Sequence, residues 1–204
     1  MSRNNVSSVH AFDGSLDPNV QVKSREIIKA AYKRPDLEDY TNIVLPGIVP
    51  NCVDVFILDE DEMVLMGHRV NAPLKGCPHT SGGRQANGDS YGEAAAFHVK
   101  RDLDLDVDPS RFEFVMSSSF PFSSSAQGVP CHMNGVQMAV RLSRDELAKR
   151  SVPTTGDFAD SRFFALSEVT EDVGFHPAVV LGVRIIQYNL KNHGRLGTID
   201  PDLL

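Results

Sequence analysis

The sequence has few cysteines and no long apolar run, and each shortage argues against a class of protein. Three cysteines occur among 204 residues, Cys52, Cys77 and Cys131, and none forms a CxxC pair. This argues against a disulfide framework or a structural zinc knuckle and predicts a reducing, cytoplasmic location. No uninterrupted apolar stretch approaches about 20 residues, so we expect no membrane span. The polar N-terminus also lacks the apolar segment of a signal peptide.

Basic residues are also in short supply. The chain has 20 Lys and Arg against 27 Asp and Glu, which gives a net charge of −7. Because nucleic acids and anionic membranes bind basic surfaces, this balance argues against both kinds of partner, although it leaves room for one nucleotide in a pocket. The 15 glycines and 12 prolines are too few for a low-complexity chain. Length and a 41% hydrophobic content predict one domain with a substantial core.

Helix-like and strand-like segments mix without strict alternation. Amphipathic spacing and caps predict helices over about 17–33, 90–103 and 177–190, and a capping box at 143–146 opens a further short helix. Strand patterns cover 53–58, 63–66, 112–116, 136–142 and 162–166, the first two forming a hairpin. Residues 71–89 are rich in Gly, Pro, Asn and Ser and are expected to form a long functional loop. This mixture predicts an α+β fold, either in separate layers or as an α/β/α sandwich around a mixed sheet.

The segment from 67 to 105 contains the residues best suited to chemistry. Gly82 and Gly83 lead through a polar loop into the predicted helix of residues 90–103. Glycines let a backbone approach a diphosphate closely and adopt a positive φ. His98 and Asp102 are four residues apart and therefore share a helix face. A carboxylate at this place can hold a magnesium ion that bridges phosphate oxygens.

This segment resembles the Nudix box, whose pattern is Gly, five residues, Glu, seven residues, then Arg-Glu-aliphatic-x-Glu-Glu-x-Gly-aliphatic. Counting from Gly83, the same spacing leads to Asp89 and then to residues 97–105, and the apolar positions match. The acidic positions mostly do not. The departures are Phe97 for the arginine, His98 and Arg101 for glutamates, Asp102 for the last glutamate and Asp104 for the glycine.

The Nudix resemblance covers about residues 48–190 and implies an α/β/α sandwich with a mixed sheet. Residues 1–47 would form an added N-terminal arm and helix, and 191–204 a C-terminal tail. Within the family, the loop pattern is similar to that of GDP-mannose mannosyl hydrolases, with Gly-x-Arg at 67–69, Asn-x-Pro at 71–73 and Gly-Gly-Arg at 82–84. The extra helix and the habit of the family suggest a homodimer, which would be symmetric.

The resemblance implies a nucleotide diphosphate ligand held by arginines. Arg69 and Arg84 would meet the diphosphate of a nucleotide sugar, since a guanidinium pairs phosphate oxygens bidentately. Arg101 stands in a metal-ligand position and would repel a second metal ion. It either pairs the phosphate directly in place of that ion or forms a surface salt bridge.

The resemblance also implies a single divalent metal ion. The Gly82 carbonyl, Asp102 and a later loop acid, Asp157, would hold Mg²⁺ or Mn²⁺. If His98 is a further ligand, Zn²⁺ or Fe²⁺ becomes the expected ion, because imidazole suits these metals. The alternative is that Asp102 is a solvated helix acid and His98 a polar residue satisfied by its neighbours.

The general base of the GDP-mannose subgroup is missing, because Phe158 follows Asp157 where that subgroup has a histidine. Activation of water would then fall to His98, His132 or His79, since imidazole titrates near neutrality. Two functions remain open. One is a Nudix-type hydrolase of a nucleoside-diphosphate derivative, and the other is a Nudix fold that has lost or changed the hydrolytic activity.

Overall fold

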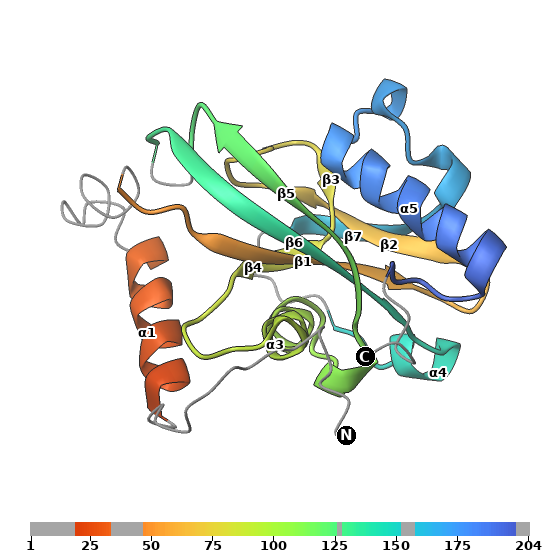
Figure 1. Cartoon of the computed structure of the whole chain (residues 1–204), viewed down its shortest axis with the longest axis horizontal. Coiled ribbons are helices and arrows are strands. Elements are labelled where there is room, and N and C mark those ends of the chain that lie inside the picture. Colours follow the sequence, from red (N-terminus) through yellow and green to blue (C-terminus); the bar gives the residue numbers. More distant parts are fainter. Residues whose placement is uncertain (1–18, 34–46, 126–127, 152–157, 199–204) are drawn as a thin grey trace, which may run out of the picture.

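The computed structural model describes residues 19–33, 47–125, 128–151 and 158–198, which form a mixed sheet with helices on both faces (Figure 1). The helices are α1 (Asn19–Lys33), α3 (Tyr91–Leu103), α4 (Arg144–Leu147) and α5 (Pro177–His193). The strands are β1 (Asn51–Leu58), β2 (Met63–Arg69), β3 (Pro78–His79), β4 (Ser81–Arg84), β5 (Glu113–Phe122), β6 (Cys131–Arg141) and β7 (Phe158–Ala165). The predicted α+β sandwich is confirmed. None of the helices in these ranges has the length and apolar character needed to cross a membrane.

β1 lies at the centre of the sheet, and its two halves have different neighbours. The strand order is β3-β2-β1-β6-β5, with β7 paired to β2 and β4 paired to β1. β1 runs parallel to β6 along its whole length. β2 pairs antiparallel with the end of β1, whereas β4 pairs antiparallel with residues 52–55. Where β2 leaves β1, β4 therefore takes its place, and this register puts Gly82 opposite Asp54 and Gly83 opposite Val53.

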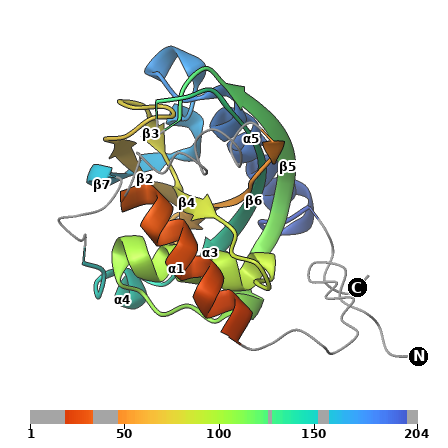
Figure 2. The same cartoon turned by 90° about the vertical axis from the view of Figure 1, so that its left-hand side faces the viewer.

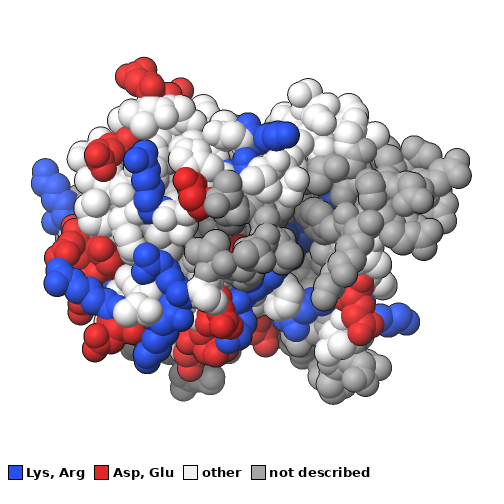
Figure 3. Space-filling model, turned by 180° about the vertical axis from the view of Figure 1, so that it is seen from behind, with Lys and Arg blue, Asp and Glu red and all other residues white. Residues whose placement is uncertain are grey.

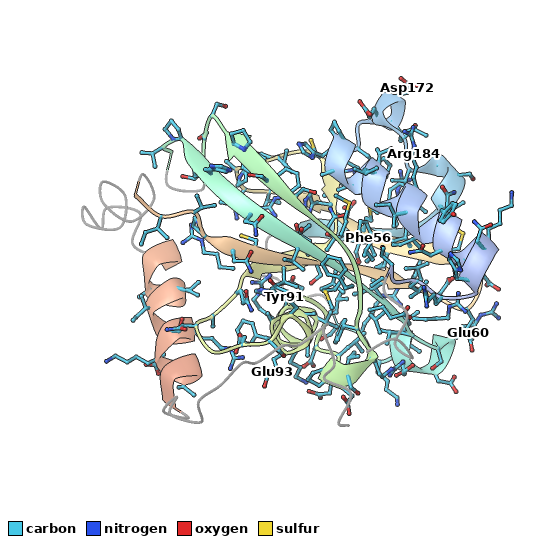
Figure 4. The ribbon with its side chains drawn as sticks, viewed as in Figure 1. Phe56, Glu60, Tyr91, Glu93, Asp172 and Arg184 are labelled. Atoms are coloured by element: carbon cyan, nitrogen blue, oxygen red, sulfur yellow. The ribbon has the colours of Figure 1, made fainter. Side chains whose placement is uncertain are left out.

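Alternation along β1 divides the core into two layers. Val53, Val55 and Ile57 pack in the cluster that contains the buried residues of α3, while Phe56 and Leu58 pack with those of α5. Figure 4 shows Phe56 on the α5 side of the sheet and Tyr91 on the α3 side. Because successive side chains of a strand point to opposite faces, Asp54 lies on the same face as Phe56. A carboxyl group thus stands where the pattern of β1 calls for an apolar residue.

α3 begins at a capping box, as its sequence predicts. Ser90 Oγ accepts a hydrogen bond from Glu93 N at 3.1 Å, and the Glu93 carboxylate accepts one from Ser90 N at 2.8 Å. Such a cap typically contributes about 1 kcal/mol. The buried face of the helix carries alanine, valine and leucine side chains, and also His98 and Asp102. Two polar residues of the box are therefore held against the sheet instead of facing solvent.

Three predicted boundaries need correction. The loop at 71–89 contains β3 and β4, because its small residues pair with neighbouring strands although they show no apolar pattern. The strands predicted at 112–116 and 136–142 are longer, as β5 and β6. Pro121 fits within β5 because β5 is an edge strand, where a missing N–H breaks no ladder. Finally, the closing helix predicted to end near 190 is α5, which continues to His193, and Leu196 beyond it is buried in the core.

α1 lies beside the loop between β4 and α3 (Figure 2). Arg25 Nη2 donates to Asp89 Oδ1 at 2.6 Å, and its guanidinium lies 4.8 Å from the centre of the Phe97 ring. Ser24 Oγ also accepts a hydrogen bond from Asn87 N. Burial raises the pKa of Asp89, and the charge of Arg25 opposes that shift. Asp89 stands at the position of the first glutamate of the Nudix pattern. In this protein its ion pair with Arg25 holds α1 against the loop between β4 and α3.

Charged side chains are mixed over the face shown in Figure 3, where Lys and Arg lie among Asp and Glu. Several of them form exposed ion pairs, such as Lys100 with Asp104 and Asp106. Exposed pairs of this kind contribute little to stability, because water and salt screen their charges. The charges that bear on function are instead the partly or fully buried ones described next.

Candidate functional site

A pocket opens on the α5 face of the sheet, beside the first turn of α5. It is lined by β1, β4, β5 and β6, by the end of β2 and by the residues that follow it. Phe120, Phe122 and His176 form one aromatic group in its wall, with ring centres 5.9 to 6.2 Å apart. The polar side chains that line the pocket are Asp54, Arg69, His79, Arg84, Gln137 and His176. The pocket therefore combines two guanidinium groups and one carboxyl group with flat aromatic surfaces.

Arg69 and Arg84, both predicted to meet a diphosphate, line this same pocket. Arg84 ends β4 and is 7% exposed. Arg69 ends β2, where Arg69 N donates to Cys77 O and Gly76 N donates to Arg69 O. The Nε of Arg69 is buried and has no hydrogen-bond partner among the described residues. Because an unpaired buried donor is costly, an oxygen of a bound ligand is a suitable acceptor for it.

Asp54 is a pocket residue that the sequence patterns did not single out. Burial raises its pKa, and the positive charges of His79 and Arg69 oppose the shift. Burial lowers the pKa of His79, whose Nδ1 lies 3.1 Å from Thr80 O. A signal for Asp54 was nevertheless present, since it is the one carboxyl group within the apolar run 52–58. A polar residue in a strand whose other positions are core is a candidate for binding.

The three histidines considered in the sequence and His176 separate into two pairs. His79 and His176 line the pocket, whereas His98 and His132 do not. His132 is an exposed residue of β6, and its Nε2 lies 2.6 Å from Ser119 Oγ. His98 is 2% exposed on the α3 side, and burial together with the charge of Arg101 lowers its pKa to about 3. His98 and His132, which were predicted to be catalytic, therefore do not line this pocket.

On the α3 side of β4, the predicted metal-binding residues form a hydrogen-bonded cluster with Arg101. Arg101 Nη2 donates to Gly82 O at 2.7 Å and to Asp102 Oδ2 at 2.8 Å, and its Nε donates to Asp102 Oδ1 at 2.6 Å. Ser81 Oγ donates to Asp102 Oδ2 at 2.7 Å. Gly82 and Asp102 are thus brought together as predicted, but around a guanidinium. Asp157, the third predicted ligand, lies outside the described residues.

This cluster does not fit a divalent cation. Magnesium takes about six oxygen ligands in octahedral geometry, whereas both oxygens of Asp102 and the Gly82 carbonyl already accept hydrogen bonds. Within the described ranges, no group of three or more His, Cys, Asp or Glu side chains is placed to hold a metal, His98 included. The charge of Arg101 adds repulsion. Two unit charges about 4 Å apart repel by about 4 kcal/mol at an effective dielectric of 20, and a divalent ion doubles this.

Gly82 and Gly83 make room for one polar group on each face of β4. A Cβ on Gly82 would lie 2.2 Å from Asp54 Oδ1, on the pocket side. A Cβ on Gly83 would lie 2.9 Å from His98 Cε1 and 3.1 Å from Arg101 Nη1, on the α3 side. Neither glycine has a positive φ, contrary to the expectation from sequence. Because these glycines have no Cβ, Asp54 can pack closely against one face of β4, and His98 and Arg101 against the other.

Comparison with solved structures finds this fold in many Nudix proteins. The MutT Nudix hydrolase from Burkholderia pseudomallei superposes with a TM-score of 0.56 at 16% identity, over 69% of this chain and 99% of that one. The Nudix domain of NrtR from Shewanella oneidensis, solved with ADP-ribose, gives 0.54 at 15% identity, over 71% and 90%. The ORF135 protein from E. coli gives 0.52 at 14% identity, over 71% and 91%. No family model and no curated protein matches the sequence.

The chain therefore has the Nudix fold, which confirms the fold that the Nudix resemblance implied. Identities near 15% carry the fold alone, so the activity of these neighbours does not transfer with it.

Proposed function

We propose that this protein binds a nucleoside diphosphate derivative, such as a nucleotide sugar, in the pocket lined by Arg69 and Arg84. The observation that carries this proposal is that two arginines from different strands line one pocket of a Nudix fold. Arginine is the side chain best suited to planar, bidentate recognition of phosphate oxygens. The NrtR domain with the same fold was solved with ADP-ribose, a nucleoside diphosphate derivative, which supports the class of ligand.

The rest of the pocket suits the other parts of such a ligand. The rings of Phe120 and Phe122 offer flat apolar surfaces for a base or a sugar ring. Asp54 can accept hydrogen bonds from a base N–H or from sugar hydroxyl groups. With Arg69 and Arg84 outnumbering the one carboxyl group, the charge of the pocket favours an anionic ligand.

Binding without metal-dependent hydrolysis is the form of this function that the geometry supports best. The metal site implied by the Nudix resemblance would use the Gly82 carbonyl and Asp102, and both are bonded to Arg101. The described pocket also contains neither His98 nor His132. A second candidate, hydrolysis without a metal ion, is favoured by the presence of both His79 and Asp54 in the lining of the pocket, because a buried carboxyl group and an imidazole can act as acid and base.

Replacing Arg84 with alanine is expected to weaken binding of ADP-ribose or GDP-mannose at least about ten-fold, because a charge-assisted hydrogen bond contributes roughly 1.5–3 kcal/mol. Isothermal titration calorimetry on the folded variant measures the change. Arg184→Ala is the matched control, since Arg184 is exposed on α5 away from the pocket (Figure 4). Unchanged affinity in Arg84→Ala would remove this residue from the site.

Chromatography of the recovered ligand should show it intact, whereas hydrolysis products would favour the second candidate.

A further inference from the structure

The contacts of Arg101 are those that a bound cation would make. One nitrogen, Nη2, is shared between the Gly82 carbonyl and Asp102 Oδ2, and Nε reaches the other carboxylate oxygen, all within 2.6 to 2.8 Å. The Asp102 side chain is 2% exposed, so its charge is compensated inside the protein. A buried carboxylate requires such a partner, and a guanidinium paired at both oxygens is a strong one.

The neighbouring residues hold Arg101 in this place. Ser81 Oγ donates the remaining hydrogen bond to Asp102 Oδ2 at 2.7 Å, which fixes the carboxylate. Gly83 leaves the space that the guanidinium occupies, because a Cβ there would lie 3.1 Å from Arg101 Nη1. His98 packs against the same glycine as a neutral ring and adds no competing charge. The fixed carboxylate and the space at Gly83 therefore suit an arginine at position 101.

The charge of Arg101 also reaches the pocket on the other side of β4. Asp54 lies on the pocket wall, and Arg101 is among the cations that favour its ionised form. β4 is a short strand whose first three residues, Ser81 to Gly83, are small, and its main chain lies between Arg101 and Asp54. A positive charge fixed here acts on an anionic ligand in the pocket as a metal ion would, though with one unit of charge.

We propose that Arg101 permanently takes the place of the divalent cation in this fold, so that the protein binds its ligand without a metal ion. The part that concerns the ligand rests on the proposed function. The part that concerns the metal does not, because it depends on Gly82, Asp102 and Arg101 alone. Arg101 stands where the Nudix pattern has a glutamate, so one substitution there should exchange the built-in cation for a metal ligand.

The test is titration of the nucleotide-free protein with Mn²⁺ alone, followed by the electron paramagnetic resonance signal of free Mn²⁺. Wild type is expected to show no saturable binding below about 1 mM. Arg101→Glu, checked for folding by circular dichroism, is expected to bind one Mn²⁺ per chain. Its affinity should be at least about ten-fold tighter than the limit of about 1 mM given for wild type. Adding Asp102→Asn to Arg101→Glu should abolish this binding, and Arg101→Gln, which removes the cation without adding a carboxylate, separates loss of repulsion from gain of a ligand.

Wild-type protein that binds one Mn²⁺ per chain, with affinity reduced by Asp102→Asn, would overturn the proposal even if Arg101→Glu failed to fold. Folded Arg101→Glu with no gain in Mn²⁺ affinity would overturn it as well. Because no nucleotide is present in this experiment, its failure is distinct from a failure of nucleotide binding.

Discussion

Replacing Gly82 with alanine is expected to lower the free energy of unfolding by about 3 kcal/mol. The added Cβ would lie 2.2 Å from Asp54 Oδ1, 2.7 Å from Val53 O and 2.8 Å from Asp54 Cα. Two of these three are main-chain atoms of β1, so rotation of a side chain cannot relieve the overlap. β4 would have to move away from β1 and lose part of its pairing.

Urea denaturation measures this effect in a graded series of three variants. Gly83→Ala is expected to cost less than Gly82→Ala, because its Cβ meets side-chain atoms of His98 and Arg101 and no main-chain atom within the closest contacts. Gly47→Ala is the control, since nothing lies within 4 Å of a Cβ at Gly47. If Gly82→Ala were as stable as Gly47→Ala, the close approach of β4 to β1 would be refuted.

The free energy of unfolding is expected to fall as the pH drops from 6.5 towards 4, and His98 accounts for part of this fall. Burial and the charge of Arg101 lower the pKa of His98 to about 3 in the folded protein. An unfolded histidine has a pKa near 6.5, so between these values the unfolded state binds more protons. Each pH unit in this window then costs about 1.4 kcal/mol, or about 3 kcal/mol between pH 6.5 and pH 4.

His98→Gln isolates this contribution, because glutamine does not titrate. The stability of wild type relative to the variant should decrease by about 3 kcal/mol from pH 7 to pH 4, measured by urea denaturation at each pH. His79 and His176, whose pKa values burial also lowers, remain in both proteins and cancel in the difference. Parallel stability curves would show that His98 titrates normally and is not enclosed as described.

Features specified by local sequence could be predicted, and features specified by distant contacts could not. The helix from 91 to 103 follows from its capping box and apolar stripe, and the hairpin of β1 and β2 from short apolar runs around an acidic turn. β4 escaped prediction because Ser-Gly-Gly-Arg has no strand pattern. β4 forms a strand because β2 pairs only with the end of β1, so the main chain of residues 52–55 of β1 can pair with β4.

The candidate site shows the same division. The Nudix resemblance implied that Gly82 and Asp102 lie together and that Arg69 and Arg84 meet one ligand, and the structure brings each of these pairs together. Sequence left two roles open for Arg101, pairing a phosphate or forming a surface salt bridge. In the structure it pairs a buried carboxylate and a main-chain carbonyl, a contact that depends on how closely β4 packs on α3.

The most direct measurement is a pair of calorimetric titrations of wild-type protein with ADP-ribose or GDP-mannose, one in EDTA and one in excess Mg²⁺. The central claim is that a pocket with Arg69 and Arg84 binds a nucleoside diphosphate derivative while Arg101 fills the place of the metal ion. The account predicts saturable binding in EDTA, with a dissociation constant within about two-fold of that in Mg²⁺. Binding that occurs in Mg²⁺ and disappears in EDTA would contradict it.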